Sequence, residues 1–172
     1  ITEGDIVKHA VVGVDFTRAK VKDVMTQPVV GMSHTTSFDA CCMLMALKKV
    51  GHLVIFGDEG EILGMISLTD VLNSVQGDFI RALTLSMEAM REDVPVVERG
   101  EDLEEAAKVL DREGSGCVIV ADGKVPLGIV SERDIVRWIL GIQHLEGAKV
   151  QEIMSSPVFT VPDVMKVDES MQ

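Results

Sequence analysis

The sequence predicts an α/β (α+β) fold made of two tandem β-α-β-β-α units that pack with pseudo-twofold symmetry. The main observation is an internal repeat, since residues 64–72 (GMISLTDVL) recur 64 positions later as residues 128–136 (GIVSERDIV). A second observation is a shorter phrase, MTQPVV from Met25, which returns in altered form from Met90 and again as MSSPVF from Met154. Each unit is too small to close a core alone, so neighbouring units should pack on each other.

Each unit is expected to start with a short strand and a helix. Val29-Val30 and Val96-Val97 are β-branched pairs that follow a proline, and such residues favour strands. The helices that follow are expected at residues 40–50 and 106–113.

Capping residues set the predicted ends of these helices. Thr36 and Asp102 each stand three residues before an acidic residue, a spacing that is typical of a helix N-cap. Gly51 and Gly114 follow the helices, and a left-handed C-terminal residue is easy only for glycine.

Two further strands and a second helix complete each unit. Two apolar runs without alternation, as buried strands have, are each followed by a turn, a third strand and a helix. The predicted strands cover residues 53–56, 62–66, 117–120 and 126–130, and the helices cover residues 67–75 and 131–140. Residues 77–87 and 141–150 should connect the elements, and residues 5–20 should form a helix or a linker.

The repeat also predicts the domain boundaries. At an offset of 129 positions, residues 3–7 match 132–136 and residues 20–25 match 149–154. The chain therefore reads as an excerpt of a longer protein. The expected parts are a linker or the tail of a preceding unit (1–20), a first repeat (21–80), a second repeat (81–145) and the start of a further unit (146–172).

Composition and charge exclude several classes of protein. The chain of 172 residues is 47% hydrophobic, carries a net charge of −12, and has one Trp and no Tyr. So acidic a surface repels phosphate backbones, and so few aromatic side chains offer little for bases to stack on. Nucleic acid is therefore not an expected partner. The sequence shows no membrane segment, and its odd number of cysteines indicates a reducing, cytoplasmic location.

A Ser-x-x-Asp motif follows the last strand of each unit, as Ser67 to Asp70 and Ser131 to Asp134. Such a motif often only caps a helix. The same geometry also makes a ligand site, because free N–H groups bind anions and a carboxylate one turn later accepts ribose hydroxyls. The repetition favours the ligand site.

Arg133 makes the second motif more specific. An Arg in the first turn of a helix opposes the helix dipole, at a cost of about 0.3–1 kcal/mol, which suits a residue that meets a phosphate. A solvated surface role is the alternative. The first motif has Thr69 at the corresponding position, which donates a hydrogen bond but carries no charge.

Together, the Met-Thr-x-x-Pro opening and the Gly-h-h-Ser-x-x-Asp ending, where h is hydrophobic, resemble CBS domains, named for cystathionine β-synthase. The resemblance covers residues 21–76 and 83–140, with a truncated third copy at 150–172. Two CBS repeats form a Bateman module, and the resemblance implies a regulatory sensor of AMP, ADP, ATP, S-adenosylmethionine or methylthioadenosine.

The resemblance also implies the site residues. Each ribose carboxylate would face the first two strands of the other repeat, whose backbone would read the adenine edge. One cleft would contain Ser67, Thr69, Asp70, Val97, Ala106, Ser115 and Cys117. The other would contain Val30, Thr35, Ala40, His52, Ser131, Arg133 and Asp134, with Arg133 and His52 near the phosphate.

Neither catalysis nor a required cofactor or metal is expected. The histidines and cysteines show no metal-ligand spacing, and no nucleophile elbow or dinucleotide-binding loop is present. AMP or a similarly small adenosine compound is the expected ligand, ahead of ATP. A homodimer, or pairing with another CBS module, is the expected assembly. The alternative function is a ligand-free assembly module of a larger protein.

Overall fold

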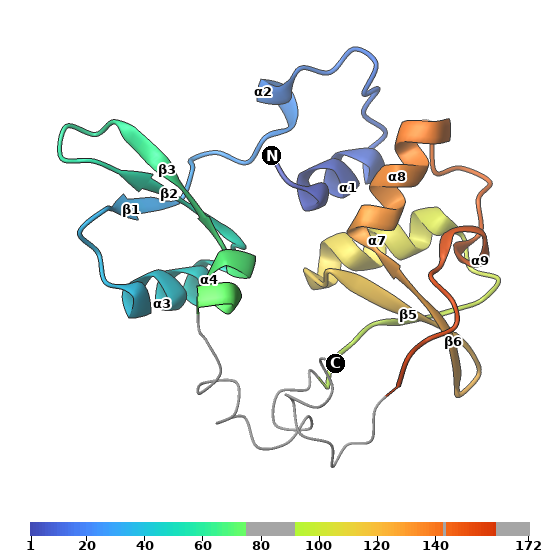
Figure 1. Ribbon diagram of the computed structural model, residues 1–172. Helices are drawn as coiled ribbons and strands as arrows, with labels where there is room; N and C mark the ends of the chain where they lie inside the picture. Colours follow the sequence, from blue (N-terminus) through green and yellow to red (C-terminus); the bar gives the residue numbers. More distant parts are fainter. Residues whose placement is uncertain (75–91, 143, 161–172) are drawn as a thin grey trace. The chain divides into compact units, whose positions relative to one another are not determined.

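The computed structural model describes residues 1–74, 92–142 and 144–160 (Figure 1). These residues form two compact units. The first-repeat unit consists of residues 27–74. The second-repeat unit consists of residues 1–26 together with the described residues from 92 to 160.

The first-repeat unit is a three-stranded sheet with two helices. Its elements are β1 (Gly31–Ser33), α3 (Phe38–Lys48), β2 (His52–Phe56), β3 (Ile62–Ser67) and α4 (Leu68–Ser74). The strand order is β1-β2-β3, with β1 parallel and β3 antiparallel to β2.

The second-repeat unit has the same order of elements and the same sheet topology. It contains β4 (Val96–Glu98), α7 (Leu103–Glu113), β5 (Cys117–Asp122), β6 (Val125–Ser131) and α8 (Glu132–Ile142), with strand order β4-β5-β6. Three further helices belong to it, namely α1 (Glu3–Val11), α2 (Val21–Val24) and α9 (Val150–Ile153). The predicted α+β fold and the β-α-β-β-α order of both repeats are confirmed.

Apolar residues from three parts of the chain share the core of the second-repeat unit. Leu103, Leu110 and Val130 are fully buried in it. Val7 of α1 and Val150 of α9 belong to the same core, and neither side chain is more than 1% exposed. Figure 1 shows α1 beside α7 and α8 in this unit. The core of the first-repeat unit is smaller and consists of Cys41, Met45, Leu53 and Val71.

The first strand of the first-repeat unit begins later than predicted. The strand is Gly31–Ser33, whereas Val29-Val30 lies before it, although the carbonyl of Val30 accepts a hydrogen bond from Val54 N–H at 3.1 Å. A Cβ atom at Gly31 would stand 2.6 Å from the carbonyl oxygen of Val54. Only glycine permits this close approach to β2. The prediction for Val96-Val97 is confirmed.

Both predicted ends of the helix α3 were wrong by one or two residues. The N-cap is Ser37, whose hydroxyl accepts a hydrogen bond from Ala40 N–H at 3.4 Å, and not Thr36. The left-handed residue is Lys49, with φ of 52°, and not Gly51. The N–H of Val50 bonds the carbonyl of Met45 at 3.1 Å, which closes the last turn before the glycine is reached.

The helix α7 ends as predicted, with Gly114 at φ of 56°. Asp102 stands at the predicted N-cap but its side chain does not cap the helix. The Asp102 carboxylate instead binds the ammonium of Lys149 at 2.8 Å. This ion pair ties the start of α7 to the segment before α9.

The third copy of the repeat begins as part of the second-repeat unit. Ser155 pairs with Ile129 through an antiparallel bridge, which adds residues after α9 to the edge of β6. The predicted connection at 77–87 and residues 161–172 lie outside the described residues. Among the helices of the described residues, none is long and apolar enough to cross a membrane.

Candidate functional site

The motif from Ser131 to Asp134 joins the end of β6 to the first turn of α8. One carboxylate oxygen of Asp134, Oδ2, accepts hydrogen bonds from the Ser131 N–H at 2.9 Å and the Ser131 hydroxyl at 2.6 Å. Within the described residues, the structure shows no hydrogen bond to the other oxygen, Oδ1. The carboxylate is therefore oriented by Ser131 and has one oxygen available for a ligand.

The motif from Ser67 to Asp70 has the same geometry. Asp70 Oδ2 accepts from the Ser67 N–H at 2.8 Å and from its hydroxyl at 2.6 Å. The Ser67 hydroxyl, the Ser67 N–H and the charge of His52 lower the pKa of Asp70, although burial opposes them. Asp70 is exposed, whereas Asp134 is half-buried.

The capping interpretation of both motifs is thus correct in its geometry. In each motif the Ser hydroxyl accepts a hydrogen bond from the backbone N–H of the Asp. The nitrogen-to-oxygen distance is 3.2 Å for Asp70 and Ser67 and 3.4 Å for Asp134 and Ser131. Since capping occupies only one carboxylate oxygen, it leaves the ligand interpretation open.

A third motif of this kind begins at Thr2, and the sequence analysis missed it. Asp5 Oδ2 accepts from the Thr2 N–H at 2.7 Å and from the Thr2 hydroxyl at 3.2 Å. The signal was present, because Thr2 stands 129 positions before Ser131, but the repeat was aligned only from Glu3.

Asp5 differs from Asp134 in having both oxygens occupied. Its Oδ1 accepts a hydrogen bond from the hydroxyl of Thr26, and the residue is buried. Burial alone would raise the pKa of Asp5, but the hydrogen bonds from Thr26 and Thr2 hold it below its usual value. This third motif therefore anchors α1 and offers no free oxygen to a ligand.

An open hollow of about 370 Å³ lies beside the second motif. It is lined by Ser131, Arg133, Gly116, Glu3 and Glu132. The guanidinium Nε of Arg133 lies 3.6 Å from the carboxylate of Glu3, and the Arg133 side chain is 70% exposed. The hollow thus contains a cation that already has an acidic partner, and a Ser131 hydroxyl that already donates to Asp134.

Glu132 brings a second carboxylate to this hollow. Its side chain lies against Gly4, where an added Cβ would stand 3.1 Å from Oε1. Burial raises the pKa of Glu132, and the charges of Glu3 and Asp5 raise it further. Acidic residues of α1 and α8 therefore crowd together where the two helices begin.

Other predicted site residues lie at several levels of exposure. Ser115 is buried and donates its hydroxyl to the Cys117 carbonyl at 2.7 Å, so that donor is occupied. Thr35 is exposed and bonds Ser33 through its hydroxyl. Thr69 is exposed, Val97 and Ala106 are buried, and Val30, Ala40 and Cys117 are half-buried.

The structure brings the predicted residues together in two groups. His52 pairs with Ser67 across β2 and β3, beside Thr69 and Asp70. In the second-repeat unit, Cys117 pairs with Ser131 across β5 and β6, next to Arg133 and Asp134. The sharing of a cleft between the two repeats stays a prediction.

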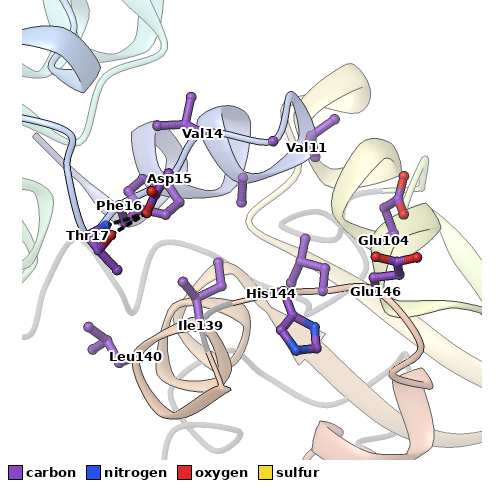
Figure 2. A pocket seen from close by; sticks show the side chains of 13 residues that line it. Val11, Val14, Asp15, Phe16, Thr17, Glu104, Ile139, Leu140, His144 and Glu146 are labelled. Carbon is purple, nitrogen blue, oxygen red and sulfur yellow. Dashed lines mark hydrogen bonds between the residues drawn. The ribbon is translucent and has the colours of Figure 1, made fainter.

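A larger cavity of about 610 Å³ lies elsewhere in the second-repeat unit (Figure 2). Val11, Phe16 and Ile139 supply apolar surface, while Glu104 and Glu146 line another part of it. No Lys or Arg and no Ser-x-x-Asp motif lines this cavity. Its chemistry does not suit a phosphate, and the sequence analysis did not single it out.

No metal site is evident in the part of the chain that the structure describes. No group of three or more His, Cys, Asp or Glu side chains there could hold a metal ion.

The chain is similar in sequence to a known domain family and to several known proteins. The model of the CBS domain family matches residues 21–77 and 85–141. Protein MJ1225 of Methanocaldococcus jannaschii is 25% identical over 153 residues, which cover 86% of this chain and 52% of MJ1225. A homoserine O-acetyltransferase of Methanocorpusculum labreanum is 27% identical over 126 residues, which cover 73% of this chain and 25% of that protein.

Solved structures show the same fold. The crystal structure of MJ1225 superposes with a TM-score of 0.83 at 20% identity, covering 99% of this chain and 70% of that one. A conserved protein from Pyrococcus horikoshii has a TM-score of 0.67 at 21% identity, covering 86% of this chain and 66% of that one. In sequence, the chain spans between 25% and 47% of the length of the first three curated relatives that it matches.

Proposed function

Since this chain belongs to the CBS domain family, as the match over both repeats shows, we propose that it is a regulatory module that binds an adenosine-type ligand. AMP, ADP, ATP and S-adenosylmethionine-type compounds are the candidates. Binding would change the shape or rigidity of the module, and this change would pass to partner domains.

The observation that carries this proposal is the geometry of Asp134. Ser131 orients the carboxylate through two hydrogen bonds to Oδ2, which leaves Oδ1 available. A carboxylate held in this way can accept hydrogen bonds from ribose hydroxyls, and charge-assisted bonds of this type are strong. The hollow next to it contains Arg133 in the first turn of α8, where a helix end favours a negative group.

The remaining roles follow from the resemblance. Asp70 with Ser67 would bind ribose in the first repeat, and Thr69 would donate a hydrogen bond there. His52 would contribute charge near a phosphate, and the backbone of the strands at Val30 and Val97 would read the adenine edge. The side chains of Thr35, Ala40, Ala106, Ser115 and Cys117 would line the sites.

The module itself would not be catalytic. A homoserine O-acetyltransferase matches this chain over a quarter of its own length, so a CBS pair attached to an enzyme is one arrangement for the whole protein. A homodimer, or pairing with another CBS module, is the assembly that we propose. The alternative function is a ligand-free dimerisation module.

Binding can be tested by thermal unfolding of the purified protein with each compound. A ligand at 100 times its dissociation constant stabilises the folded state by about 2.7 kcal/mol. At about 2–4 °C per kcal/mol, the melting temperature should rise by several degrees. Unchanged melting curves with AMP, ADP, ATP, S-adenosylmethionine and methylthioadenosine would favour the assembly module.

Two variants assign the binding to the motif. Asp134→Asn should reduce the shift for every adenosine compound, because ribose is common to all of them. Asp122→Asn is a matched control, since Asp122 is exposed at the end of β5 and pairs with Arg99 at 3.6 Å. Mass spectrometry of small molecules released from the native protein would identify a ligand that co-purifies.

A further inference from the structure

The hollow beside Ser131 contains more negative than positive charge. Glu3 and Glu132 contribute two carboxylates to its lining, whereas Arg133 contributes one guanidinium. A ligand phosphate that approaches Arg133 therefore meets a cation whose charge Glu3 already balances at 3.6 Å. The phosphate must compete with Glu3 for Arg133 and is repelled by both carboxylates.

Glu3 comes from outside the two CBS repeats that the family model matches, which begin at residue 21. Its position is nevertheless set by the fold, because three contacts hold α1 in place. Val7 is buried in the core of the second-repeat unit, and the Asp5 carboxylate accepts a hydrogen bond from the Thr26 hydroxyl. The Glu132 side chain also packs against Gly4.

The position of α1 places an acidic residue at the site where the repeat alone predicts a phosphate. The residue of the third motif that corresponds to Arg133 is Gly4, so α1 brings no cation to the lining of the hollow in exchange. The environment of Glu132 fits this excess of negative charge, since burial and then the charges of Glu3 and Asp5 raise the pKa of its carboxyl.

We propose that Glu3 is a specificity-determining residue of this hollow, which disfavours phosphorylated adenosine compounds relative to those with an uncharged or cationic 5′ substituent. This inference rests on the proposed function, because it concerns which adenosine compound the Asp134 motif accepts. Ribose hydroxyls would still bind Asp134, and adenine would be unaffected. The discrimination would arise only at the 5′ end, where the charge of the ligand differs.

Isothermal titration calorimetry can test the role of Glu3. AMP, 5′-methylthioadenosine and S-adenosylmethionine are the probes, because they share adenosine and carry a negative, neutral and positive 5′ group. The measured quantity is the ratio of the dissociation constants of AMP and 5′-methylthioadenosine. In Glu3→Gln this ratio should shift in favour of AMP by about two- to fivefold, the range expected for a partly exposed ion pair.

S-adenosylmethionine should respond in the opposite direction, losing affinity in Glu3→Gln. Asp122→Asn again serves as the matched control, because its pair with Arg99 has the same 3.6 Å separation. It removes one negative charge away from the hollow, so it corrects for the change in net charge and should leave the ratio as it was.

The outcomes separate this inference from the proposed function. If the natural sequence binds none of the three compounds, the proposed function is wrong and the inference fails with it. If they bind but the ratio is the same in Glu3→Gln and Asp122→Asn, the proposed function stands and Glu3 does not determine specificity. A similar melting temperature of all three proteins, without ligand, excludes loss of folding as the cause.

Discussion

The sulfur of Met154 lies against the backbone of Gly128, where an added Cβ would stand 2.6 Å from Sδ and 3.0 Å from the carbonyl oxygen of Ser155. Ser155 also pairs with Ile129, so the third copy of the Met-x-x-Pro phrase covers the end of the second repeat. A side chain at position 128 would therefore displace this segment.

Gly128→Ala should destabilise the protein for this reason. Forcing a methyl group into a closely packed site costs about 1–3 kcal/mol, and urea unfolding would measure the loss. Gly141→Ala is the control, because nothing in the described residues lies within 4 Å of its added Cβ. Gly141 is in α8, where alanine is preferred by about 0.5–1 kcal/mol, so this variant should be as stable as the parent or more so.

Thr26→Val should also destabilise the protein. The change keeps the shape of the side chain but removes the hydroxyl that donates to the buried carboxylate of Asp5. Loss of such a partner costs about 1–3 kcal/mol. Thr69→Val is the control, since Thr69 is exposed and its hydroxyl bonds nothing within the described residues.

The effect of Thr26→Val should depend on pH. Because the folded-state pKa of Asp5 is lowered, its stabilising contribution is present above its ordinary value of 3.8 and is lost as pH falls through the folded-state pKa. The difference in melting temperature between Thr26→Val and the parent should shrink in acid. A difference that stays constant from neutral pH to pH well below 3.8 would contradict this assignment.

Glu132→Gln should stabilise the protein at neutral pH. The folded-state pKa of Glu132 is raised above 4.5, so the charged carboxyl disfavours the folded state as pH rises through that range. Removing the charge should raise the melting temperature at pH 7, and the gain should vanish below pH 4.5. Glu113→Gln removes an exposed carboxylate that pairs with Arg112, and it should give no such gain.

Arg133→Ala should weaken the binding of AMP more than the binding of 5′-methylthioadenosine. A bond between a guanidinium and a phosphate contributes about 1.5–3 kcal/mol, and pairing with Glu3 places the expected effect near the lower end. Arg99→Ala is the control, because Arg99 is also exposed and also pairs with a carboxylate at 3.6 Å. Equal losses for both compounds in calorimetry would mean that Arg133 does not contact the phosphate.

The two Ser-x-x-Asp motifs should be unequal for phosphorylated ligands. The motif at Asp134 keeps a nearby cation, Arg133, even though Glu3 competes with a phosphate for it, whereas the motif at Asp70 has the uncharged Thr69 at the same position. Asp134→Asn should therefore weaken the binding of AMP more than Asp70→Asn does. The ranking is wrong if Asp70→Asn abolishes AMP binding while Asp134→Asn has no effect.

Features that depend on neighbouring residues could be predicted well. The order of strands and helices in both repeats and the cap at Gly114 agree with the structure. The bonds from Ser131 to Asp134 follow from a spacing of three residues at the start of a helix. Small errors remained at helix ends. The left-handed residue after α3 was predicted at Gly51 but is Lys49, because the last helical turn closes before the glycine.

The sequence by itself determined the repeated unit, its secondary structure and the two oriented carboxylates, because each depends on residues within a few turns of one another. Only the tertiary structure decided what surrounds them. Thr26 bonds Asp5 across 21 residues, and Glu3 pairs with Arg133, which lies far from it in the sequence. Such contacts form only when burial of residues such as Val7 brings distant segments together, and no local pattern contains that information.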